Sequence, residues 1–310
     1  LAEFPEYPQH DGEFIDSMTA GQRTLLCHPG YLSCVVPGDD VDADSPLAAV
    51  AKKSLRGYLD HTHRKGLAGK IGSGCDLTWC WLLAAAIRLR DGQYADLLLT
   101  QIGLADFVKP NGMFAFLGGR VCADKAAKRR AYHVENTQMH SLLTMSANAR
   151  GRERTMSMVE HSSAFIFAII ESMLQSHHRQ IKLFPTPLAA MGRRCSFHRL
   201  RAQGGVVVSA GRDEKGLTWF ELECEYDYAG SLRFFAGKNP SVLKCERQDG
   251  KIVPLRRIDN RTYGLTLQKG DRLSWQRDAN IAVGGAAAPA PQSAIRQYPY
   301  PNCPISYGLA

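Results

Sequence analysis

The chain has 310 residues, of which 45% are hydrophobic, and it carries a formal net charge of +8. This length is enough for two domains with sizeable cores. The sequence shows no apolar run of about 18 residues and no signal-peptide pattern, so we expect no membrane partner and leave the localisation open. The densest basic cluster, residues 125–130, lacks interleaved aromatics, and we therefore expect no nucleic-acid partner. The chain begins with Leu1, which favours a fragment of a longer protein.

The nine cysteines are scattered and odd in number. None has the Cys-x-x-Cys spacing of a zinc ribbon, and so large a chain does not need a disulfide framework. The pair His61 and His63 has no evident third ligand. We therefore predict free buried thiols, no metal site and no cofactor.

Helices are predicted through the first half of the chain. Asp44-Ser45-Pro46 is a strong helix start, and that helix should run to about His63. Further helices are expected at residues 76–90, 93–102, 136–149 and 162–176. In the last of these, Ser162 and Ser163 are candidate N-caps, and the apolar residues that follow cover nearly the whole helix, which indicates burial on most sides.

After Gln180 the hydrophobic period changes from that of a helix to that of a strand. Short strand candidates lie at residues 205–210, 217–223, 231–235, 252–255 and 263–267, separated by turns such as Asp249-Gly250. This spacing predicts an antiparallel β-sandwich. The Ala/Pro-rich tail at residues 283–310 is expected to be disordered.

The segment from Val159 to Leu188 resembles glycoside hydrolase family 95, the α-L-fucosidase and α-L-galactosidase group. The family has Gln-Ile-Asp-Gly-Asn-Phe-Gly, a helix, Glu-Met-Leu-Leu-Gln-Ser-His and Ile-His-Leu-Leu-Pro-Ala-Leu-Pro. An ungapped alignment places Glu160 on the catalytic Asp of the family, and the downstream residues 200–205 are close to the family's Leu-Arg-Ala-Arg-Gly-Gly. Six residues of the segment match: Gln175, Ser176, His177, Leu183, Pro185 and Leu188. The departures are Glu160 itself and the sequence His-Ser-Ser-Ala that follows it.

The resemblance implies an α+β multidomain fold. Residues 1–178 would form the C-terminal part of an (α/α)6 helical toroid, and residues 179–282 an antiparallel β-sandwich. It also implies a glycosidase that hydrolyses a terminal α-L-fucosyl or related bond of an oligosaccharide or polysaccharide with inversion. Glu160 would be the catalytic base, and His28, His161 and Trp81 would bind substrate. The general acid of the family would lie upstream of Leu1, so this chain alone could be inactive.

The residues by themselves leave other interpretations open. Glu160 could simply favour the N-terminus of a helix, where a carboxylate is stabilising. His28 could be structural, and Trp81 could belong to a core. The altered motif also suits a non-catalytic carbohydrate-binding or structural remnant. A third alternative is a polysaccharide lyase on a similar toroid, which would suit the +8 charge.

Overall fold

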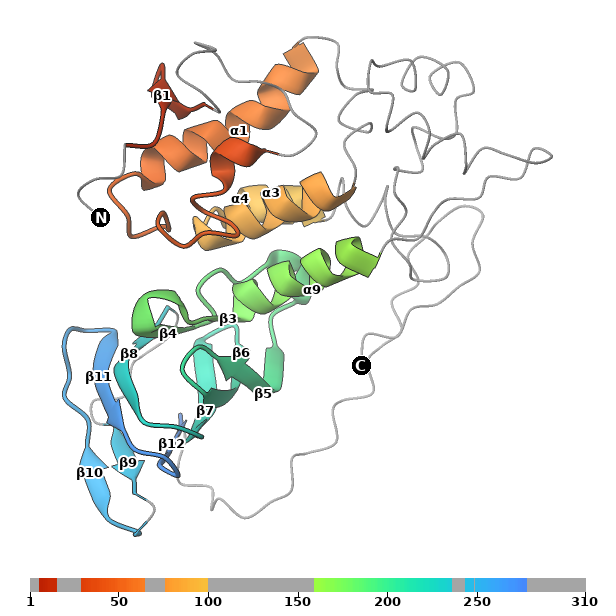
Figure 1. The fold of residues 1–310 in the computed structure, drawn as a ribbon. Coiled ribbons are helices and arrows are strands. Elements are labelled where there is room, and N and C mark those ends of the chain that lie inside the picture. The colour runs from red at the N-terminus through yellow and green to blue at the C-terminus, as the bar shows by residue number, and fades with distance from the viewer. Residues whose placement is uncertain are drawn as a thin grey trace, which may run out of the picture.

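The protein is described here by a computed structural model, which places residues 6–15, 29–64, 76–99, 159–235, 243–247 and 249–277. Within these ranges the chain forms four α-helices and twelve β-strands in three sheets. Figure 1 shows the helices gathered on one side and the two larger sheets on the other, with helix α9 (Val159–Met173) between them. Among the helices described, none has the length and apolar character needed to cross a membrane.

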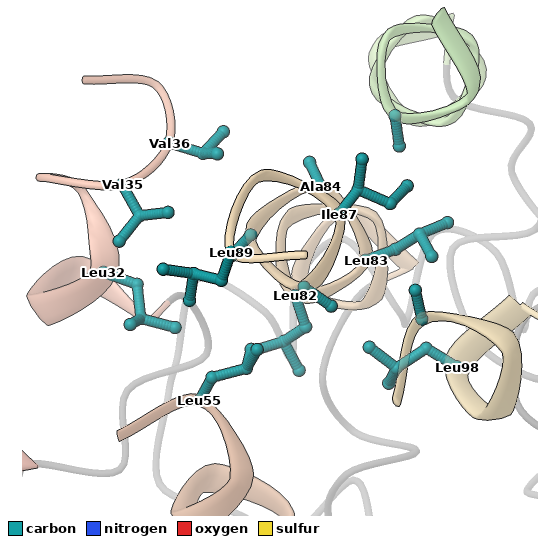
Figure 2. Close-up of a cluster of buried hydrophobic side chains, with 14 of the residues drawn as sticks. Leu32, Val35, Val36, Leu55, Leu82, Leu83, Ala84, Ile87, Leu89 and Leu98 are labelled. Carbon is teal, nitrogen blue, oxygen red and sulfur yellow. The ribbon is translucent and has the colours of Figure 1, made fainter. Parts of the chain in front are cut away.

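The helical part is centred on helix α3 (Asp76–Arg88). Because the side chains of α3 are mostly apolar, other elements cover it on several sides. Its neighbours are α1 (Ala48–Arg64), α4 (Gly92–Leu97) and α9. Figure 2 shows α3 nearly end-on, with buried side chains from several elements directed toward it. Apart from the residues of α3 and Leu89, the labelled side chains are Leu32, Val35, Val36, Leu55 and Leu98. A 3-10 turn (Gly30–Leu32) and a hairpin of β1 (Gln9–His10) and β2 (Glu13–Phe14) complete this part.

The strand-rich part contains two sheets that share a second apolar core. The six-stranded sheet has the order β10 (Ile252–Pro254), β9 (Lys244–Glu246), β12 (Arg272–Gln276), β7 (Gly216–Cys224), β6 (Val206–Asp213) and β5 (Cys195–Ala202). The four-stranded sheet has the order β11 (Thr262–Leu267), β8 (Tyr228–Phe234), β4 (Gln180–Leu183) and β3 (Leu174–Gln175).

Aromatic side chains join the two sheets face to face. Phe220 of β7 and Phe234 of β8 have ring centroids 5.5 Å apart, and Phe234 lies 6.0 Å from Tyr263 of β11. All three rings are at most 1% exposed. The core between the sheets is therefore formed by alternate residues of each strand, which leaves the other face of each sheet free for polar side chains.

The predicted partial (α/α)6 toroid is wrong. The described residues contain four α-helices beside twelve strands, so by element they are mostly β-structure. Helix α3 is buried among α1, α4, α9 and Leu188, rather than in a ring of helical hairpins. Helix α9 is only partly buried, with Ile166 56% and Phe167 38% exposed, so its predicted burial on most sides is wrong. Apolar residues around a helix predict that it is buried, but they do not specify which elements cover it. The sheets expected after Gln180 are present.

Two local expectations also need correction. Ser162 and Ser163 lie inside α9, which already includes Val159, so neither is an N-cap. The second sheet is not purely antiparallel, because β4 pairs with β8 in parallel. Strand β4 follows β3 through a short antiparallel connection and then pairs with β8 in parallel. The helix predicted at residues 136–149 and the tail at 283–310 lie outside the described residues.

Candidate functional site

Glu160 and His161 occupy the first turn of α9, as the backbone of that helix places them. Their side chains are outside what the structure describes, and His28 is outside the described residues altogether. Trp81 of α3 is half-buried and packs against the helical core, which agrees with the alternative interpretation that Trp81 belongs to a core. Of the four sequence-predicted site residues, the structure therefore places the backbones of three on the adjoining helices α3 and α9.

The C-terminal end of α9 is fixed to both parts of the fold. Ser176 accepts a hydrogen bond from the backbone N–H of Gln203 at 3.0 Å, which connects it to the turn between β5 and β6. Gln175 is 1% exposed and donates to the carbonyl of Glu171 at 3.1 Å. Farther on, Leu188 enters the helical core. Residues that carry the family resemblance thus have structural roles at this junction.

His177 belongs to a buried polar cluster that the sequence analysis did not anticipate. Asp42 lies in the loop before α1, His177 in a 3-10 turn (His177–Arg179) after α9, and Lys182 in β4. The Asp42 Oδ2 atom lies 2.9 Å from His177 Nε2 and 2.6 Å from Lys182 Nζ. All three residues are at most 5% exposed. We call this set the junction cluster, because it joins the helical part to the four-stranded sheet.

The junction cluster is consistent with an ionised Asp42. Burial alone raises the pKa of this carboxyl, but the hydrogen bonds from His177 and Lys182 and the charge of Lys182 outweigh it and hold the pKa of Asp42 well below its usual range. A carboxylate can only accept hydrogen bonds, so the His177 ring donates from Nε2. Its Nδ1 atom then remains buried without a hydrogen-bond partner among the described residues.

Further charged contacts surround the junction cluster. Asp44 accepts hydrogen bonds from Arg90 and, at 2.9 Å, from Arg233 of β8. In the interior, Arg88 of α3 pairs with Glu171 of α9 at 3.1 Å and also donates to the carbonyl of Val35 at 2.8 Å. Buried charges are tolerated only when they are paired in this manner. These contacts stabilise the position of α9 between the helices and the sheets.

The junction cluster is a poor metal site, although Asp42, His177 and His178 bring their ligand atoms within 4.8 Å of one another. The ammonium of Lys182 lies 3.1 Å from His177 Nε2 and 2.6 Å from Asp42 Oδ2. It therefore supplies the positive charge that a cation would bring and lies against the same two ligand atoms. The burial of all three cluster residues also leaves no space for a substrate, so the chemistry of this cluster is structural.

Part of this arrangement had a signal in the sequence. The Gln175-Ser176-His177 match pointed to the segment, but not to the partners of these residues. Gly204 and Gly205 at the β5–β6 turn have φ values of +80° and +74°, where glycine is favoured, and this explains the paired glycines of the downstream match. Asp42 is one of four aspartates between residues 39 and 44, and nothing in the local pattern marks it as the partner of Lys182.

Comparison with known proteins adds no relative: no protein-family model and no curated protein matches this chain.

Proposed function

We propose that this chain is a glycoside hydrolase-like protein that hydrolyses a terminal α-L-fucosyl or related glycosidic bond with inversion. The observation that carries the proposal is the segment from Val159 to Leu188, which retains the order and spacing of the family block. Within it, Glu160 stands at the start of α9, and the matching residues Gln175, Ser176 and His177 anchor the end of the same helix.

The anchoring of α9 bears on the proposed chemistry. A catalytic carboxylate must be held within about 0.5 Å of its productive position, which requires rigid support. Buried ion pairs hold α9 to α3 through Glu171, and the junction cluster holds its end to β4. These contacts hold the C-terminal end of α9, and Glu160 stands in the first turn of the same helix.

In this proposal Glu160 is the general base. It would accept a proton from the attacking water while a second carboxylic acid protonates the leaving oxygen. An inverting site needs the two carboxyl groups about 6.5–9.5 Å apart, and this requirement does not depend on a toroid. His161 and His28 are proposed to line the substrate-binding site. The proposed reaction uses no cofactor. We do not carry the lyase alternative further, because it depended on the toroid.

The test is the substitution Glu160→Gln, which keeps the size of the side chain and removes its basicity. We expect release of L-fucose from an aryl α-L-fucoside to fall at least about 100-fold, the usual scale for the loss of a general base. NMR should show the newly released sugar first as the inverted anomer. The matched control is Glu214→Gln, an exposed glutamate in the β6–β7 turn. Wild-type turnover by Glu160→Gln would remove Glu160 from the mechanism, and a retained anomer would reject the inverting scheme.

A further inference from the structure

The outer face of the six-stranded sheet carries a regular polar surface. Along β7, Phe220 and Leu222 point into the core, so Glu221 and Glu223 between and beside them point outward. Strand β12 repeats this alternation, with Leu273 buried and Arg272 and Ser274 exposed. Polar side chains from neighbouring strands therefore meet on one face.

These side chains surround a half-open groove of about 360 Å³. Its lining comes from five adjacent strands, β5, β6, β7, β12 and β9, which at about 4.8 Å per strand gives a length of roughly 19 Å. Its volume lies in the usual range for small-molecule sites, and its length suits an extended ligand better than a compact one. The polar lining residues are Arg199, Ser209, Glu221, Glu223, Glu246, Arg272 and Ser274.

Charge within the groove is closely balanced. Glu223 lies between Arg199, at 3.5 Å, and Arg272, at 4.0 Å. Glu221 has Ser209 and Ser274 as its cross-strand neighbours, and it makes no ion pair with any described residue. The groove thus alternates guanidinium donors, carboxylate acceptors and hydroxyls that can do both. Farther along the same face of β7, two residues from Glu221, Trp219 lies outside the groove lining, and its ring centroid is 5.3 Å from that of His198.

We infer that this groove binds a neutral oligosaccharide. Two guanidinium groups and three carboxylates give it no excess of positive charge for a phosphate or an acidic polymer. The carboxylates do not form a cation site either, because the one group of potential metal ligands among the described residues is the junction cluster with His178. Sugar hydroxyls both donate and accept, so they match interleaved carboxylate, guanidinium and hydroxyl groups along the groove.

The aromatic pair on the same face of the sheet suits the same ligand. The faces of sugar rings are apolar, and an indole or imidazole ring offers a flat surface against which they can pack. The choice of carbohydrate as the ligand class rests on the proposed function, but the site itself lies on the sheet and does not include Glu160. Binding here would hold an oligosaccharide on the protein whether or not the chain hydrolyses it.

The test measures binding of 2′-fucosyllactose by isothermal titration calorimetry, with the Glu160→Gln protein used to prevent turnover. Two variants in that background address the groove. Glu221→Gln removes one acceptor charge without changing size, and Ser274→Phe fills the groove from an exposed strand position. The controls are Glu214→Gln in the β6–β7 turn and Thr266→Phe, an exposed position of β11 in the other sheet.

We expect saturable binding with a component that weakens at least 10-fold in Glu221→Gln and in Ser274→Phe, and that is unchanged in Glu214→Gln and Thr266→Phe. A component that is the same in all five proteins belongs to the site of Glu160. Binding to Ser274→Phe with the parent affinity would overturn the inference, as would the absence of saturable binding in the parent. The hydrolysis assay separates this result from the proposed function. Fucose release without groove binding would reject the groove alone, and groove binding without fucose release would reject the hydrolase alone.

Discussion

Removal of the Asp42 carboxylate should destabilise the fold more than any single surface substitution. The Asp42→Asn variant keeps the shape of the side chain, but it leaves the buried ammonium of Lys182 with only the more distant Asp44, at 3.6 Å, as a negative partner. Lys182 is 2% exposed and lies 2.6 Å from Asp42 Oδ2. One of the two oxygens becomes an NH2 group, so either His177 and Lys182 or the backbone N–H of Asp44 loses its acceptor. The perturbation therefore creates a buried charge that Asp44 compensates only in part, rather than removing a favourable surface contact.

The expected loss in the free energy of unfolding follows from the removal of the nearer partner of this buried charge. Breaking a buried ion pair by removing one partner costs about 3–5 kcal/mol. For a folded unit of this size, each kcal/mol lowers Tm by about 2–4 °C, so the expected decrease is roughly 6–20 °C. The second substitution Lys182→Met removes the orphaned charge, and most of the loss should be recovered in the double variant, because a well-packed apolar side chain can replace a buried charge at little cost.

The assay is thermal and urea unfolding of the wild-type protein, Asp42→Asn, Lys182→Met and the double variant. Asp39→Asn is the matched control, since Asp39 lies three residues away and makes no hydrogen bond or ion pair that the structure describes. A decrease in Tm below about 2 °C for Asp42→Asn would refute the reasoning, because it would mean that Lys182 is not held in a buried pair. Failure of Lys182→Met to rescue Asp42→Asn would show that the loss arises elsewhere.

Three further predictions concern pH, packing and thiol reactivity. Because the pKa of Asp42 is lowered in the folded state, its stabilisation is present above its unfolded value of about 3.9 and is lost as the pH falls below that value, so Asp42→Asn should flatten the acid dependence of urea unfolding. Gly211→Ala should lower the free energy of unfolding by about 1–3 kcal/mol, because a Cβ there would lie 2.3 Å from Trp219 Nε1. An unchanged Tm would contradict this packing, and the second substitution Trp219→Leu should relieve the clash. Burial raises the pKa of Cys34 to about 11 and that of Cys224 to about 12, so both thiols should be alkylated at pH 8 only after denaturation. Mass spectrometry of native and unfolded samples measures this alkylation, and rapid labelling of the native protein would contradict the burial of these thiols.

Local patterns in the sequence predicted much of the secondary structure. The helix expected from Asp44 to about His63 is α1 (Ala48–Arg64), and the one expected at residues 76–90 is α3 (Asp76–Arg88). The strand expected at residues 217–223 is β7 (Gly216–Cys224). These elements were predictable because their periodicity depends on residues two to four positions apart.

The arrangement of those elements was not predictable in the same way. The apolar faces of α3 and α9 indicated burial, and the family resemblance suggested a toroid as its cause. Instead, the structure buries α3 among α1, α4, α9 and the segment around Leu188 that follows β4, and it leaves Ile166 and Phe167 of α9 exposed. Many partners can cover an apolar helix face at similar free energy, so the face alone does not select among them.

The two polar sites depended most on the tertiary structure. Asp42 and His177 are 135 residues apart, and the groove combines Ser209, Glu221 and Ser274 from three strands. No local spacing relates such residues, because long-range chain packing and strand register bring them together. The sequence by itself determined which segments form helices and strands, while only the tertiary structure decided which carboxylate meets Lys182 and which side chains share the outer face of the sheet.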